Sequence, residues 1–76
     1  MARMISFTVH LSRPDLVDDL IDAFRLGGCL AWRTGSRTCC VEHTAAVDDE
    51  EARVEMTFFL RAWAARHDRP QASLAH

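Results

Sequence analysis

The chain has 76 residues, with nine basic and eleven acidic side chains and a formal net charge of −2. This length predicts a single domain over residues 1–76. A domain of this size buries only about 60% of its unfolded surface and often gains stability by self-association. The charge gives no electrostatic basis for binding nucleic acid. No apolar run approaches the roughly 18 residues of a membrane span, and no stretch is typical of a secretion signal, so we expect a cytoplasmic protein.

The three cysteines, Cys29, Cys39 and Cys40, do not form a disulfide framework, since their number is odd and their spacing irregular. Cys39 and Cys40 are neighbours on a predicted strand and therefore point to opposite faces. We interpret all three as small buried or half-buried residues in a reducing compartment.

The first predicted element is a strand over residues 4–11, because apolar and polar side chains alternate there with a period of two. The apolar face consists of Ile5, Phe7, Val9 and Leu11, and the other face consists of Met4, Ser6, Thr8 and His10. The second face is uncharged and half-polar, which suits a surface that another protein or a ligand covers.

A helix is predicted to follow from Ser12. Ser12 and Asp15 have the spacing of a capping box, and Pro14 stands in the first turn, where its missing N–H costs nothing. Apolar residues recur at helical spacing from Leu16 to Phe24. We expect Gly27 and Gly28 to end the helix.

Residues 29–34 and 37–43 are predicted to form a hairpin around Gly35 and Ser36. Its loop length is left open by the sequence, and a slip of one residue inverts the faces of the second strand. A two-residue loop places on one face Leu30, Trp32, Cys39 and Val41. A three-residue loop groups Cys29 and Ala31 with Cys39 and Val41, which leaves Trp32 on the open face beside His10, together with Leu30 and Cys40.

Asp48, with Glu51 three residues later, is the predicted cap of a second helix, which Pro70 ends. One broad apolar stripe should cover the sheet: Ala52, Met56, Phe59, Leu60 and Trp63. A second stripe exceeds what one small sheet can cover and suggests a contact between subunits through Phe58: Val54, Phe58, Ala62 and Ala65. Residues 71–75 form a short last strand or none.

These elements predict an α+β fold, a ferredoxin-like βαββα(β) sandwich whose antiparallel sheet carries two helices on one face. The expected strand order is 4-1-3-2, and the other face of the sheet is open. If the last strand is absent, the first strand becomes an exposed edge that invites pairing with a second chain. Homodimerisation is expected in either case, whether or not the last strand forms.

The segment from Arg13-Pro14-Asp15-Leu16-Val17 through Gly28-Cys29-Leu30-Ala31 resembles the first half of an ACT domain, a small regulatory module. The resemblance implies a small ligand bound at a dimer interface near Ser12 to Asp15, with Trp32 on the open face. Asp15 stands where the family usually has the glycine that lets the loop approach an amino acid. The order of elements is also similar to small uncharacterised proteins of GC-rich bacteria, which implies no activity.

No catalytic constellation is visible, so we predict neither an enzyme nor a bound cofactor. His10 and Cys40, with His43 as a possible third ligand, are too few for a closed metal site, and no metal is predicted. Arg33 and Arg37 flank the hairpin tip and suit an acidic partner. The predicted role is a non-catalytic module that binds a second copy or another protein through the open face, helped by the second stripe, without nucleic acid or membrane. The interaction candidates are Trp32, Leu30, His10, Arg33 and Phe58.

Overall fold

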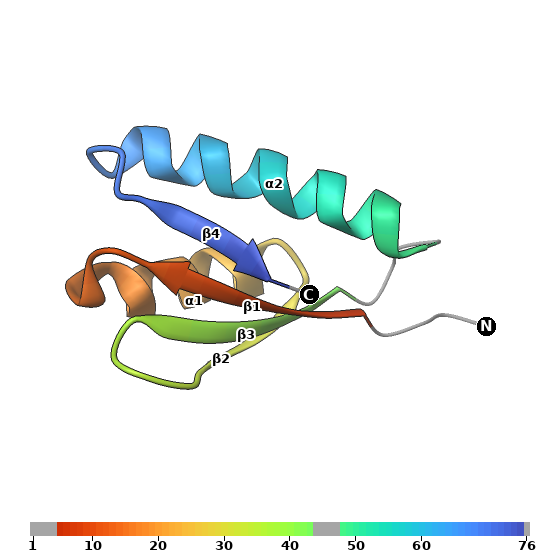
Figure 1. Cartoon of the computed structure of the whole chain (residues 1–76), viewed down its shortest axis with the longest axis horizontal. Helices are drawn as coiled ribbons and strands as arrows, with labels where there is room; N and C mark the ends of the chain where they lie inside the picture. The colour runs from red at the N-terminus through yellow and green to blue at the C-terminus, as the bar shows by residue number, and fades with distance from the viewer. Residues whose placement is uncertain (1–4, 44–47, 76) are drawn as a thin grey trace.

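The computed structural model describes residues 5–43 and 48–75, in which one antiparallel sheet of four strands packs against two helices (Figure 1). The strands are β1 (Ile5–Leu11), β2 (Leu30–Arg33), β3 (Thr38–His43) and β4 (Ala72–Ala75). The helices are α1 (Val17–Leu26) and α2 (Asp49–Arg66), and a 3-10 turn, η1 (Pro14–Leu16), precedes α1. This is the predicted α+β class. Met4, which the alternation assigned to the first strand, lies outside the described residues.

The strands are ordered β2-β3-β1-β4, so that β1 and β3 occupy the centre and β2 and β4 form the edges. All three pairings are antiparallel. The predicted last strand is present and short, with four residues from Ala72 to Ala75. It pairs with β1, which is therefore a central strand rather than an exposed edge.

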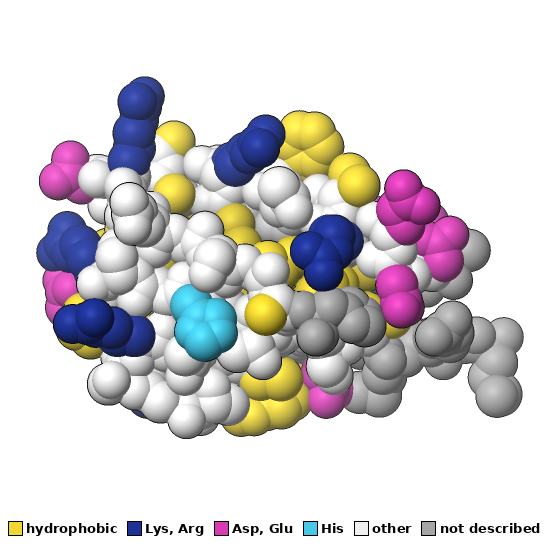
Figure 2. Space-filling view, viewed as in Figure 1, with side chains coloured by type: hydrophobic (Ala, Val, Ile, Leu, Met, Phe, Trp, Pro, Cys, Tyr) yellow, Lys and Arg dark blue, Asp and Glu magenta, His cyan; other side chains and the backbone are white. Residues whose placement is uncertain are grey.

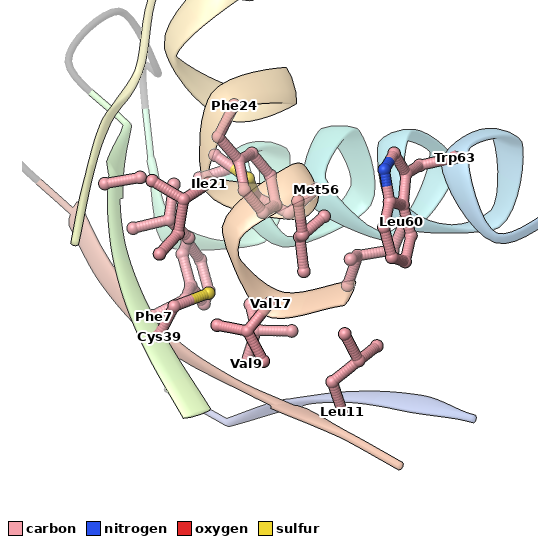
Figure 3. Close-up of a cluster of buried hydrophobic side chains, with 14 of the residues drawn as sticks. Phe7, Val9, Leu11, Val17, Ile21, Phe24, Cys39, Met56, Leu60 and Trp63 are labelled. Atoms are coloured by element: carbon pink, nitrogen blue, oxygen red, sulfur yellow. The ribbon is translucent and has the colours of Figure 1, made fainter. Parts of the chain in front are cut away.

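The alternation in β1 is confirmed by burial, which separates a covered face of the sheet from an open one. Its four apolar residues from Ile5 to Leu11 are buried, whereas Ser6 and His10 are exposed. The buried side chains fill the space between the sheet and the two helices (Figure 3). One face of the sheet thus makes the core, and the reverse face carries the polar set.

Each helix covers a different part of the sheet. α1 lies against β2 and β3, and α2 contacts β4. Phe24 of α1 stacks on Phe59 of α2 with ring centroids 4.6 Å apart, which joins the two helices. The buried residues of α2 are Ala52, Met56, Leu60 and Trp63, so the first predicted stripe faces the core as expected. Burial of side chains the size of Met56 and Leu60 contributes about 1.5–3 kcal/mol each relative to exposure.

The predicted capping box at the start of the first helix is wrong. The Ser12 hydroxyl accepts a hydrogen bond from the Gln71 amide at 2.9 Å, and the Asp15 carboxylate pairs with Arg13 at 2.6 Å. The chain enters α1 through η1, with Pro14 at its start and no side-chain cap. The Ser12 hydroxyl is not free to cap the helix, because the segment before β4 runs beside it. The backbone N–H of Gln71 in that segment uses the hydroxyl as its acceptor.

Two other helix ends behave as predicted. Gly28 has a φ of 91°, and it closes α1 with bonds from Gly28 N to Arg25 O and from Cys29 N to Phe24 O, both at 3.0 Å. This is the Schellman pattern, which glycine forms at little cost. At the start of α2, the Asp48 side chain accepts a hydrogen bond from Glu51 N at 2.8 Å.

The end of α2 differs from the expectation that Pro70 terminates it. The helix ends at Arg66, and Asp68 and Arg69 follow with φ values of 66° and 51°. Arg69 N donates to Ala64 O at 2.8 Å. Two successive left-handed residues therefore reverse the chain before Pro70, which is buried after the turn.

Replacing Asp68 with glycine should raise the free energy of unfolding by about 0.5–1 kcal/mol, because glycine occupies the left-handed region without a Cβ clash. Urea denaturation followed by circular dichroism measures the change. The matched control is Ala62→Gly on the exposed side of α2, where we expect a loss of about 1 kcal/mol. A loss in both variants would contradict the strain assigned to Asp68.

Candidate functional site

The hairpin between β2 and β3 has the three-residue loop, which decides between the two alternatives left open by the sequence. Thr34 N donates to Thr38 O at 3.1 Å, and the next pairs are Arg33 with Cys39 and Trp32 with Cys40. Ala31 and Cys39 are buried in the core, whereas Trp32 is exposed. The open face therefore receives Leu30, Trp32 and Cys40.

The open face is built from rows of cross-strand neighbours. Across all four strands, one row runs from Trp32 through Cys40 and Thr8 to Ala75. A second row contains Thr38, His10 and Ser73. Figure 2 looks onto the strands with α1 behind them, and charged side chains lie mainly around the margins of this view. Glu42 lies opposite both Leu30 and Ser6 on this face. It is the one carboxylate that the described strands place there.

Leu30 and Trp32 form the apolar part of this face, and we call this pair the β2 patch. Their exposed fractions are 51% and 41%. The expectation that Trp32 lies beside His10 is wrong, because β3 separates the two strands and Trp32 faces Cys40 while His10 faces Thr38. The direct cross-strand neighbours of the β2 patch are therefore the Cys40 thiol and the Glu42 carboxylate rather than an imidazole.

Arg33 does not belong to the β2 patch. It pairs with the buried Cys39 and so points to the covered side of the sheet. Its guanidinium donates to the carbonyl oxygens of Gly35 and Ser36 at 3.1 Å and lies 3.3 Å from an Asp18 oxygen. Arg33 therefore stabilises the hairpin loop and links the loop to α1. Fewer N–H groups of its guanidinium remain for a partner than we predicted.

Phe58 is 66% exposed on α2, together with Val54 one turn earlier. The predicted second stripe is thus a surface feature. It cannot assist a contact made by the β2 patch, however, because α2 packs over β4 at the other edge of the sheet. The two apolar surfaces are separate.

The structure does not bring together His10, Cys40 and His43, the three side chains weighed as metal ligands. His10 and Cys40 share the open face, but His43 lies on the covered side, where its imidazole hydrogen-bonds the Glu55 carboxylate of α2. Within residues 5–43 and 48–75, no three side chains of the His, Cys, Asp and Glu types are placed to hold a metal ion.

His43 and Glu55 instead line a hollow of about 130 Å³ together with Cys29. Its other walls are apolar: Phe24, Gly27, Met56 and Phe59. Burial and the nearby Glu55 carboxylate raise the pKa of the Cys29 thiol. A thiol becomes a nucleophile as its thiolate, so this environment opposes nucleophilic chemistry despite the nearby imidazole and carboxylate.

The sequence does not predict that Cys29, His43 and Glu55 come together, because it leaves open the hairpin register that decides on which face His43 lies. The register that pairs Leu30 with Glu42 places the next pair, Cys29 and His43, on the covered side. Choosing the three-residue loop would have supplied that signal. The contact with Glu55 depends on how α2 crosses the sheet, which strand periodicity does not report.

No protein-family model, curated protein or solved structure matches the chain. Neither described helix is long and apolar enough to traverse a bilayer.

The free energy of unfolding should fall as the pH rises from about 9 to about 11, partly because of Cys39. Burial, with a smaller contribution from Cys40, raises the pKa of its thiol to about 11, so the folded protein retains this proton when the unfolded chain has lost it. Cys39→Ala should show a shallower decline in urea denaturation across that range. An equal slope in both proteins would contradict the assignment.

Proposed function

We propose that this chain is a small, non-catalytic module of the ferredoxin-like class that associates with a second copy of itself through the β2 patch of its open sheet face. The main observation in support of this proposal is that the Trp32 side chain is exposed on a face with little charge. Tryptophan is a frequent anchor of protein interfaces, because its large ring is desolvated on contact. The class assignment is supported by the strand order, which is 4-1-3-2 when counted from the β4 edge.

The chemistry of the face favours contact with protein. Its row from Trp32 to Ala75 offers aromatic, thiol, hydroxyl and methyl groups, none of which carries a net charge at neutral pH. Burying this row against a second copy therefore needs no compensation of buried charge. Glu42, which is half-buried on β3 opposite Leu30, is the charged neighbour of the β2 patch outside this row.

The size of the face predicts weak association. Four strands about 4.8 Å apart, with a mean length of about 17 Å, present roughly 330 Å². A standard stable interface needs about 800 Å² from each partner. The proposed dimer therefore forms and dissociates readily, and its population depends on concentration.

Trp32→Ala should weaken self-association at least tenfold in sedimentation velocity over a micromolar to high-micromolar concentration series, because it removes the central apolar contact. The free energy of unfolding should change little, since both residues of the β2 patch are exposed. Leu30→Ser should act in the same direction.

Phe58→Ser is the matched control, because it removes an even more exposed aromatic ring from the separate surface on α2. A monomeric wild-type protein throughout the series would refute the proposal. Loss of the dimer in Phe58→Ser with an unchanged Trp32→Ala would move the interface to α2.

The alternative function is an ACT-like sensor of small ligands, which one observation favours. A hollow of about 500 Å³ lies beside the turn after β1, lined by His10, Ser12, Arg37 and Gln71 among others. The guanidinium of Arg37 there suits a ligand carboxylate. Two contacts argue against this function. The Ser12 hydroxyl already accepts a hydrogen bond from Gln71, and the Asp15 carboxylate is paired with Arg13.

If the sensor proposal holds, at least one of the twenty amino acids should raise the melting temperature in a thermal-shift screen, because a ligand that binds only the folded state stabilises it. Arg37→Gln should abolish the shift, and Arg66→Gln, on α2, should leave it unchanged. The absence of a shift with all twenty amino acids would eliminate this function.

A further inference from the structure

The two edges of the sheet differ in how their backbone is covered. At the β2 edge, Arg25 of α1 donates from Nε and Nη2 to the Ala31 carbonyl at 3.1 and 2.9 Å. Arg33 covers the adjoining hairpin loop. An arginine bound to an edge carbonyl opposes the addition of another strand there.

Among the strands that the structure describes, β4 pairs on one side only, with β1. Ser12 N donates to Gln71 O at 2.8 Å, and the register continues with Ala72 opposite Leu11 and Ser73 opposite His10. Because hydrogen-bonded and non-bonded pairs alternate in an antiparallel ladder, Ser73 and Ala75 bond to β1. Ala72 and Leu74 therefore direct their N–H and C=O groups away from the sheet.

A groove runs along this edge beneath α2. It encloses about 410 Å³ and is lined from both elements. Leu60, Ala64 and Leu74 are buried or half-buried and supply an apolar floor, while Arg53 and Arg61 are exposed at its margin. An edge strand beside a helix, with an apolar floor between them, is the arrangement to which extended peptides add.

The margin of the groove is positive. Within residues 5–43 and 48–75, neither Arg53 nor Arg61 forms an ion pair with a carboxylate. They are eight residues apart on α2, which is about 12 Å along the helix axis. Residues four apart in a strand are separated by about 13 Å and point to the same face.

We propose that the groove between α2 and β4 binds an extended acidic peptide segment of a partner protein as a fifth strand. The segment pairs with the backbone of Ala72 and Leu74, and two carboxylates four residues apart reach Arg53 and Arg61. An apolar side chain midway between them lies over Leu60 and Leu74. This site is independent of the β2 patch, which lies at the opposite edge of the sheet.

A second copy of the chain suits this groove less well. Pairing of two β4 strands would bring Arg53 and Arg61 of each copy towards the same groove margin, where like charges repel. Charge therefore favours an acidic segment over the β4 edge of another molecule.

The probe is a fluorescein-labelled threonine-rich peptide of nine residues with glutamate at its third and seventh positions and valine at its fifth. Fluorescence anisotropy with the full chain should show saturable binding that weakens as salt rises. Moving the second glutamate by one position keeps the charge but turns that carboxylate to the other face, and should weaken binding at least fivefold. The double variant Arg53→Glu/Arg61→Glu should weaken it at least tenfold, whereas Arg66→Glu, which reverses a charge on the same helix outside the groove lining, should not.

Hydrogen exchange measured by NMR tests the strand itself. On saturation, the Ala72 and Leu74 amides should become protected, and Ala72→Pro, which removes one outward N–H, should weaken binding. Equal binding of both peptides, or binding without this protection, would overturn the proposal. Protection of these amides that increases with protein concentration in the absence of peptide would overturn it as well, and would assign the edge to a second copy.

Discussion

The hairpin loop has three residues, Gly35 to Arg37, between the bonded pair of Thr34 and Thr38, and this loop length fixes the side of the sheet on which every side chain of the hairpin lies. It turns Ala31 and Cys39 into the core and Trp32 outward. It also places Cys29 and His43 at successive positions on the covered side. A loop one residue shorter would bury the indole and expose a different set of groups, so the surface chemistry depends on this ladder.

Much of the fold could be predicted because each element carries a local signal. The period of two in β1, the cap of Asp48 and the glycine end of α1 are all present in the structure. The capping box at Ser12 was wrong because a distant amide, that of Gln71, competes for the same hydroxyl. The two left-handed residues after α2 could not be predicted, because Asp68 and Arg69 have no intrinsic preference that demands this conformation.

The candidate site was predictable only in part, for a similar reason. Leu30 and Trp32 were placed together on the open face under one loop length, which the structure selects. Arg33 and His43 point to the covered side, as alternation in this register requires, but their partners there, Asp18 and Glu55, both come from helices. Contacts between a strand and a helix depend on crossing angles and lateral position, whereas alternation along one strand reports only a face.

The same sheet leaves three differently protected surfaces. Its β2 edge is closed by Arg25, and its open face is polar except for the β2 patch. Its β4 edge lies beside two arginines of α2 and pairs with no further strand among the described residues. Unprotected edges are hazards that folded proteins commonly cover. Here the arginines of α2 stand beside the edge without occupying it, so they repel a second basic groove and attract carboxylates. Protection against self-pairing and selection of an acidic strand thus follow from the same two charges.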